Sequence, residues 1–143
     1  MHTVAWSEVE RQNPELAAHA PARLDGIVYF ATVRADGSPR VHPVGVNPID
    51  GHLLVPMTPT SPKGKDLRRD NRFALHCTVE DNNGGGGEVQ LSGVAREAPA
   101  PPQFAASGWM AFALEIAEIR SITHGAHGPE VTTWHPAAGH TTV

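Results

Sequence analysis

Apolar and polar residues alternate along several short stretches of the chain, a pattern typical of half-buried β-strands. Residues 27–34 (IVYFATVR) are rich in β-branched and aromatic side chains and predict a strand. The Asp36-Gly37 pair that follows is a strong hairpin signal, and residues 40–46 form the returning strand. The Asp50-Gly51 pair predicts another turn, into a strand over residues 52–57. The first half of the chain therefore predicts an antiparallel meander.

The second half of the chain shows the same alternation of apolar and polar residues, after a polar segment over residues 61–70. Residues 72–79 and 88–96 predict two strands, joined by a flexible glycine-rich loop over residues 81–87. Residues 109–119 contain alanine and glutamate, which also favour a helix, but the strict alternation of their large apolar side chains indicates a strand. Residues 131–134 predict a last short strand.

The segment over residues 6–20 predicts one or two short helices. Ser7 with Glu10 three positions later matches a capping box. Asn13, followed by a proline, predicts a second helix start. We expect Pro21 to end the helical pattern, because proline lacks the N–H that a helix interior needs.

The polar interruption at residues 61–70 (SPKGKDLRRD) predicts a short helix. Ser61 is a candidate cap before a proline at the first helical position, and Leu67 is the lone large apolar anchor. Six or seven closely spaced strands with this helix inserted predict a mainly β protein, an antiparallel barrel. The length of 143 residues fits one domain over residues 1–143.

Charge and composition narrow the class of protein. A formal net charge of −4 argues against a nucleic-acid binder, which would usually be basic. The single cysteine, Cys77, excludes an internal disulfide and suits a reducing compartment. No apolar run approaches the roughly 20 residues of a membrane span, and the N-terminus lacks a signal-peptide core. We therefore expect a cytoplasmic protein with no membrane partner.

The start of the polar helix is the clearest candidate for chemistry. A helix N-terminus attracts phosphate through its unpaired N–H groups, and Ser61, Lys63 and Lys65 stand there, with Arg40 on a nearby strand. The competing interpretation is a solvated face of basic side chains. Lysines in a first helical turn oppose the helix dipole, however, and this cost favours an anionic ligand.

The strand that begins at Arg40 is a second candidate. Pro43 and Gly45 leave its backbone open to close approach, which suits a flat ring, and His42 is placed to donate a hydrogen bond or act as an acid. An edge strand with an exposed histidine explains the same residues.

The sequence gives little support for a metal-binding site or a catalytic nucleophile. The nine histidines form no ligand motif, and His124-x-x-His127 falls in a glycine-rich turn, so we expect no metal site. Cys77 lies mid-strand after a histidine that points to the opposite face, which indicates a buried structural thiol. No set of side chains predicts a catalytic acid, base or nucleophile, and the catalytic residues stay unknown.

Three blocks together carry a resemblance to a known family. They are residues 31–45 (ATVRADGSPRVHPVG), 60–75 (TSPKGKDLRRDNRFAL) and 88–93 (EVQLSG). In this order and spacing they resemble the pyridoxamine 5′-phosphate oxidase-like family of flavoproteins, over roughly residues 24–98. The resemblance implies a six-stranded antiparallel split β-barrel with short helices, a homodimer, and FMN bound between the two subunits.

The resemblance also implies which residues hold the cofactor. Arg40 matches an arginine that contacts phosphate, in a strand whose backbone faces the flavin ring. The positions implied around the cofactor are Arg40, Val41, His42, Pro43, Val44, Met57, Thr58, Ser61, Lys63, Lys65 and Glu88. Glu88 stands where the oxidases commonly carry a glutamine that reaches the cofactor, in some cases from the second subunit.

Two departures from the family pattern bear on the reaction. Pro62 replaces the arginine of the phosphate-binding turn, and the C-terminal tail lacks the arginine of the true oxidases. We therefore expect an FMN-dependent oxidoreductase acting on an unknown small organic substrate rather than vitamin B6 oxidase activity. The alternatives are a reductase that uses the deazaflavin coenzyme F-420, or a flavin- or haem-binding module without turnover.

Overall fold

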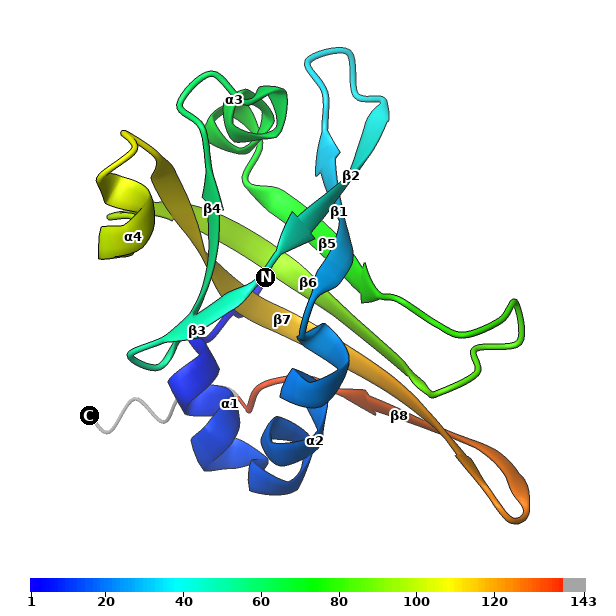
Figure 1. The fold of residues 1–143 in the computed structure, drawn as a ribbon. Coiled ribbons are helices and arrows are strands. Elements are labelled where there is room, and N and C mark those ends of the chain that lie inside the picture. The colour runs from blue at the N-terminus through cyan, green and yellow to red at the C-terminus, as the bar shows by residue number, and fades with distance from the viewer. Residues whose placement is uncertain (138–143) are drawn as a thin grey trace.

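One antiparallel sheet of eight strands dominates residues 1–137, the part of the chain that the computed structural model describes. Its hydrogen-bonded path runs β2-β1-β5-β6-β7-β4-β3, and β8 pairs with β7 (Figure 1). The strands are β1 (Ile27–Val33), β2 (Pro39–Gly45), β3 (Asn47–Ile49), β4 (His52–Met57), β5 (Arg72–Cys77), β6 (Glu88–Ala98), β7 (Met110–Gly125) and β8 (Gly128–Trp134).

The mainly β fold is confirmed, with eight strands in the described residues where the pattern predicts six or seven and the resemblance implies six. The three residues of β3 follow Gly45 and pair with β4, in a stretch with too few residues for a recognisable alternation. The segment expected over residues 109–119 is a strand, as predicted, but β7 runs on to Gly125. The chain then returns along β7 as β8.

The long strand β7 curls the sheet into a split barrel. Its residues 111–114 pair with both β4 and β6, and its later residues pair with β6 and β8. The register shifts between Ser92 and Gly93, where a Cβ on Gly93 would lie 1.9 Å from the carbonyl oxygen of Glu115. Only glycine allows so close an approach. Within residues 1–137 no ladder joins the end strands β2 and β3, although β2 contacts β4.

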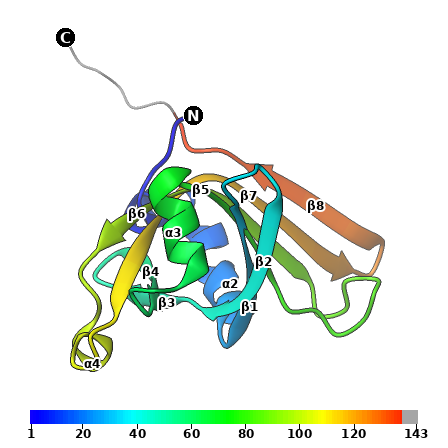
Figure 2. The same ribbon diagram turned by 90° about the horizontal axis from the view of Figure 1, so that it is seen from above.

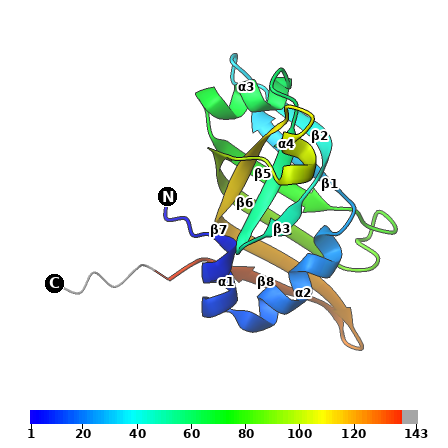
Figure 3. The same ribbon diagram turned by 60° about the vertical axis from the view of Figure 1, so that its left-hand side comes forward.

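Four helices accompany the sheet in the described part of the chain: α1 (Trp6–Gln12), α2 (Pro14–Leu24), α3 (Pro62–Arg69) and α4 (Pro102–Ala105). Figures 1 and 3 show α1 and α2 at one end of the barrel and α3 at the other. Seen from above in Figure 2, α3 lies beside the hairpin formed by β1 and β2. None of these helices, within residues 1–137, is long and apolar enough to cross a membrane.

The observed ends of α1 and α2 confirm one of the predicted helix boundaries and contradict two. Asn13 caps α2 as expected, because its side-chain oxygen accepts a hydrogen bond from the amide of Leu16 at 3.2 Å. The capping box at Ser7 is wrong, since the cap of α1 is Ala5 and makes no side-chain bond. Pro21 lies inside α2 and does not end it. The buried Leu24 beyond it shows the reason, because apolar packing of the last turn outweighs the lost backbone bond.

The core lies between the curled sheet and the helices. Alternate residues of β1 face inward, and Phe30 stacks on Phe73 with ring centroids 5.6 Å apart. Cys77 is 2% exposed and its sulfur accepts a hydrogen bond from the amide of Val89 at 3.2 Å. The predicted buried thiol is confirmed.

Candidate anion-binding site

The helix α3 forms as predicted, because a proline begins it and a single apolar residue anchors it. Leu67 is 2% exposed, and Gly64 packs so closely on the end of β4 that a Cβ there would lie 3.1 Å from the sulfur of Met57. Ser61 occupies the cap position without capping the helix. Its hydroxyl oxygen instead accepts a hydrogen bond from Lys63 Nζ at 2.8 Å.

A cavity of about 410 Å³ separates α3 from the turn of the β1–β2 hairpin. We call it the hairpin cavity; its lining residues are Arg34, Ala35, Asp36, Arg40, Pro62, Lys65, Asp66 and Arg69. Four of these side chains are cationic and two are carboxylates, so the cavity carries two net positive charges. This composition suits a small anion.

One buried carboxylate organises the cationic wall. Asp66 is 3% exposed, and its Oδ2 accepts hydrogen bonds from Arg40 Nε and Thr32 Oγ1, each at 2.7 Å. Its Oδ1 accepts from Arg69 Nη2 at 3.1 Å. Burial raises the pKa of the Asp66 carboxyl, but the bonds from Arg40, Thr32 and Arg69 outweigh burial and hold this pKa below its ordinary value.

Two cations of the cavity lining, Arg34 and Lys65, make no ion pair in the described residues, and neither does Lys63, which lies outside the lining. Burial lowers the pKa of Lys63, since its ammonium group is partly removed from water and faces only the Ser61 hydroxyl. A phosphate beside Lys63 would supply the missing negative charge.

The structure brings together part of the expected cofactor site. Arg40 and Lys65 line the same cavity, and Pro62, between Ser61 and Lys63, lies at its wall. Thr58 is exposed, and its carbonyl oxygen accepts a hydrogen bond from the amide of Ser61 at 3.1 Å. Met57 is buried under α3. These positions all meet at the N-terminal half of α3.

The remaining expected positions lie on β2 and β6. Val41 and Pro43 are exposed on the outer face of β2, His42 is exposed as well, and Val44 is buried in the core. Glu88 begins β6, roughly 20 Å along the strand from the residues near α3, and accepts a hydrogen bond from His76 Nε2 at 2.9 Å. Within one chain, Glu88 is therefore separate from the hairpin cavity.

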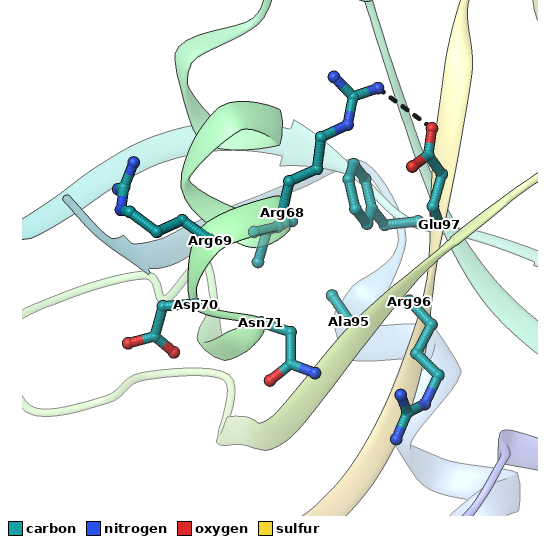
Figure 4. A pocket seen from close by; sticks show the side chains of 9 residues that line it. Arg68, Arg69, Asp70, Asn71, Ala95, Arg96 and Glu97 are labelled. Carbon is teal, nitrogen blue, oxygen red and sulfur yellow. Dashed lines mark hydrogen bonds and ion pairs between the residues drawn. The ribbon is translucent and has the colours of Figure 1, made fainter. Parts of the chain in front are cut away.

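A larger hollow, of about 610 Å³, lies on the other side of α3 and is called here the β6 cavity. Figure 4 shows its arginines pointing in different directions, with Arg68 bonded to Glu97 at 3.1 Å. Arg96 pairs with Glu115, and the guanidinium of Arg69 is turned toward Asp66 and the carbonyl of Val33. These side chains do not converge on one point, so the β6 cavity is the weaker candidate for an anion site.

The sequence does not reveal three residues at the hairpin cavity. Arg34 and Asp66 line it, and Thr32 donates a hydrogen bond to Asp66. Nothing in the local sequence distinguishes Asp66 or Arg34 from other charged residues, and Thr32 reads as an ordinary strand residue. The spacing of Pro62, Lys65, Asp66 and Arg69 along α3 does place them on one helix face, and that signal was available. It did not reveal that this face meets β1 and β2.

The split sheet and the cavity define a class: a split-barrel protein with a cation-lined cavity beside its inserted helix. A sequence profile of the pyridoxamine 5′-phosphate oxidase family matches residues 18–133, and the chain belongs to that family. No curated protein matches the sequence closely enough to be compared.

Solved structures support the fold. The chain is similar to PhzG from Burkholderia lata, solved with tetrahydrophenazine-1-carboxylic acid, at 14% identity and a TM-score of 0.58, over 90% of this chain and 92% of that one. It is similar to an F420 reductase at 15% identity and a TM-score of 0.54, over 68% of this chain and 93% of the other. It is similar to a haem-binding protein from Mycobacterium smegmatis at 20% identity and a TM-score of 0.58, over 78% of this chain. The chain spans only 54% of that protein's length.

Proposed function

We propose that this protein is a flavin-dependent oxidoreductase that holds the phosphate of FMN beside α3. The observation that carries the proposal is the convergence of Arg34, Arg40 and Lys65 on one cavity, with Asp66 buried beneath it. A phosphate monoester carries about −1.5 to −2 charges at neutral pH, which matches the two net positive charges of the hairpin cavity. Lys63 adds a further cation at the N-terminus of α3, outside the cavity lining, where it donates to the buried Ser61 hydroxyl.

The flavin ring fits best against β2 and the end of β4. Within residues 1–137, β2 pairs only with β1, so its other edge offers free backbone groups to a flat ring. In the proposal the exposed His42 and Thr58 lie beside the ring, and the buried Val44 and Met57 support the backbone of that region from within. Bound flavin would supply hydride or electron transfer, while the chain's own residues bind and orient it.

A second copy of the chain completes the site in this proposal. Ile27, Tyr29 and Val41 are 56%, 48% and 65% exposed, and β1–β2 pairing puts them on the same outer face. Large apolar side chains gathered on one sheet face favour a protein partner. Glu88 would then approach the cofactor from the partner subunit. A mass near 15.2 kDa by light scattering at micromolar concentration would contradict this homodimer.

The deazaflavin coenzyme F-420 is the second candidate, and one observation favours it. Arg69 lines both the hairpin cavity and the β6 cavity, so basic side chains continue around the C-terminal end of α3. A long acidic tail would need such a continuation. The similarity to an F420 reductase supports the same candidate.

The first experiment is an absorption and fluorescence spectrum of the purified protein, followed by titration with FMN and with F-420. We expect saturable binding of one of them, and turnover of reduced nicotinamide with a small organic acceptor. Flavin binding without any turnover would indicate a binding module. Failure of both titrations would contradict the proposal, and a Soret band after haem addition would then identify a haem-binding protein.

A further inference from the structure

We propose that Asp66 is a positioning residue that prepares the hairpin cavity for an anion by holding Arg40 in place. The inference rests on the proposed function, because it assigns the anion to the same cavity. Asp66 is nearly fully buried, although a carboxylate is costly to bury. The contacts of Asp66 must therefore offset the free-energy cost of burying its charge.

The contacts of Asp66 join three elements. Thr32 comes from β1, Arg40 from β2 and Arg69 from α3, and all three donate to the one carboxylate. Thr32 and Arg40 are also direct partners in the β1–β2 ladder. The carboxylate thus fixes the hairpin against the helix, and the hairpin cavity lies between them.

The hydrogen bond between Arg40 and Asp66 leaves the terminal donors of the Arg40 guanidinium group available for an anion. Asp66 takes its Nε, while no hydrogen bond or ion pair within residues 1–137 uses its terminal Nη atoms. The guanidinium group is flat and rigid, so fixing Nε also fixes the plane in which the Nη donors lie. An anion that meets these donors has little side-chain freedom left to remove.

A second effect of Asp66 acts in the opposite direction, and this makes the inference testable. Its negative charge repels an anion, so removing the charge alone would strengthen anion binding. Removing the support for Arg40 would weaken it. The sign of the change in affinity therefore separates the two effects.

The experiment titrates FMN and riboflavin into the full-length wild type, Asp66→Asn and Asp70→Asn. Riboflavin has the same ring without the phosphate. Asp70 is the matched control, because it lies at the end of the same helix, pairs with Arg72 and does not line the hairpin cavity. We expect Asp66→Asn to raise the FMN dissociation constant about tenfold, with riboflavin unchanged, and Asp70→Asn to change neither. Tighter FMN binding, or an equal loss for both ligands, would overturn the inference.

A measurement without flavin tests the same point independently. The ¹⁵N–¹H heteronuclear NOE of the Arg40 Nε–H group reports how rigid this side chain is in the free protein. We expect a rigid group in the wild type and in Asp70→Asn, and a mobile one in Asp66→Asn. A rigid Arg40 in Asp66→Asn would overturn the inference. If the wild type binds neither flavin but Arg40 becomes mobile in the variant, the proposed function fails and the positioning role stands.

Thr32→Val serves if Asp66→Asn does not fold. It removes one donor and leaves the charge of Asp66 in place. We expect FMN binding to weaken roughly two- to threefold, with riboflavin unaffected. No loss, or an equal loss for both ligands, would overturn the inference.

Discussion

The two cavities beside α3 contain similar residues and differ in how these are held. Each is lined by at least three cationic side chains, and Arg69 belongs to both. In the hairpin cavity the counter-charges are Asp36 and the buried Asp66, and Asp66 binds two of the arginines. In the β6 cavity Arg68 and Arg96 pair with partly exposed glutamates and point apart (Figure 4).

This difference shows that two cavities with similar numbers of cationic side chains can hold those side chains in different ways. A surface ion pair forms in water and contributes little, because both charges stay solvated. A buried carboxylate that accepts several hydrogen bonds holds its donors in one geometry. The burial of the counter-charge therefore distinguishes the two cavities, although the β6 cavity is larger.

The largest effect expected is on folding stability, from Arg40→Ala. Without Arg40, the buried Asp66 loses its shortest charged partner, and leaving a buried charge uncompensated costs about 3 kcal/mol of the free energy of unfolding. Arg96→Ala in the β6 cavity should change it by less than about 0.5 kcal/mol. Urea unfolding of both variants gives the two values, and similar losses would remove the distinction between the cavities.

Lys63→Ala should weaken FMN binding by about 1.5–3 kcal/mol, the range of a charge-assisted hydrogen bond. The physical reason is that Lys63 is partly buried beside Ser61 and has no carboxylate partner within residues 1–137. Arg68→Ala is the control in the β6 cavity and should leave FMN affinity unchanged. Fluorescence titration measures both, and an unchanged dissociation constant for Lys63→Ala would reject its role.

Acid should reduce the stability difference between the wild type and Asp66→Asn. The folded-state pKa of Asp66 lies below its ordinary value of 3.8, so the stabilising contribution of its charge is complete above about pH 5. It is lost as the pH falls through the folded-state pKa, where the native carboxylate is protonated. Urea unfolding of both proteins between pH 6 and about pH 3 measures the difference, and a difference that grows toward low pH would contradict the assignment.

The smallest effect is expected from Glu97→Gln. This change removes the partner of Arg68 at the surface of the β6 cavity, where both side chains are about half exposed. The free energy of unfolding should change by less than about 0.5 kcal/mol. A loss near that of Arg40→Ala would show that the β6 cavity is held as firmly as the hairpin cavity.

The sequence alone predicted the elements around the site. The alternation over residues 27–34 predicted β1, and the proline and single leucine of residues 61–70 predicted α3, because these signals depend on neighbouring residues. Arg40 and Lys65 were singled out by charge and by family resemblance, and both line the hairpin cavity. The local rule for proline predicts a helix end at Pro21 and is wrong there, because it takes no account of the packing of Leu24.

Only the tertiary structure decided which charges meet. Asp66 follows Arg40 by 26 residues and Thr32 by 34, and no local pattern reports contacts over such separations. Sequence identifies a charged residue, but burial and the direction of its partners determine whether that charge is solvated or held in place. The contacts of Asp66 with Arg40 and Arg69 follow from the packing of α3 against the β1–β2 hairpin.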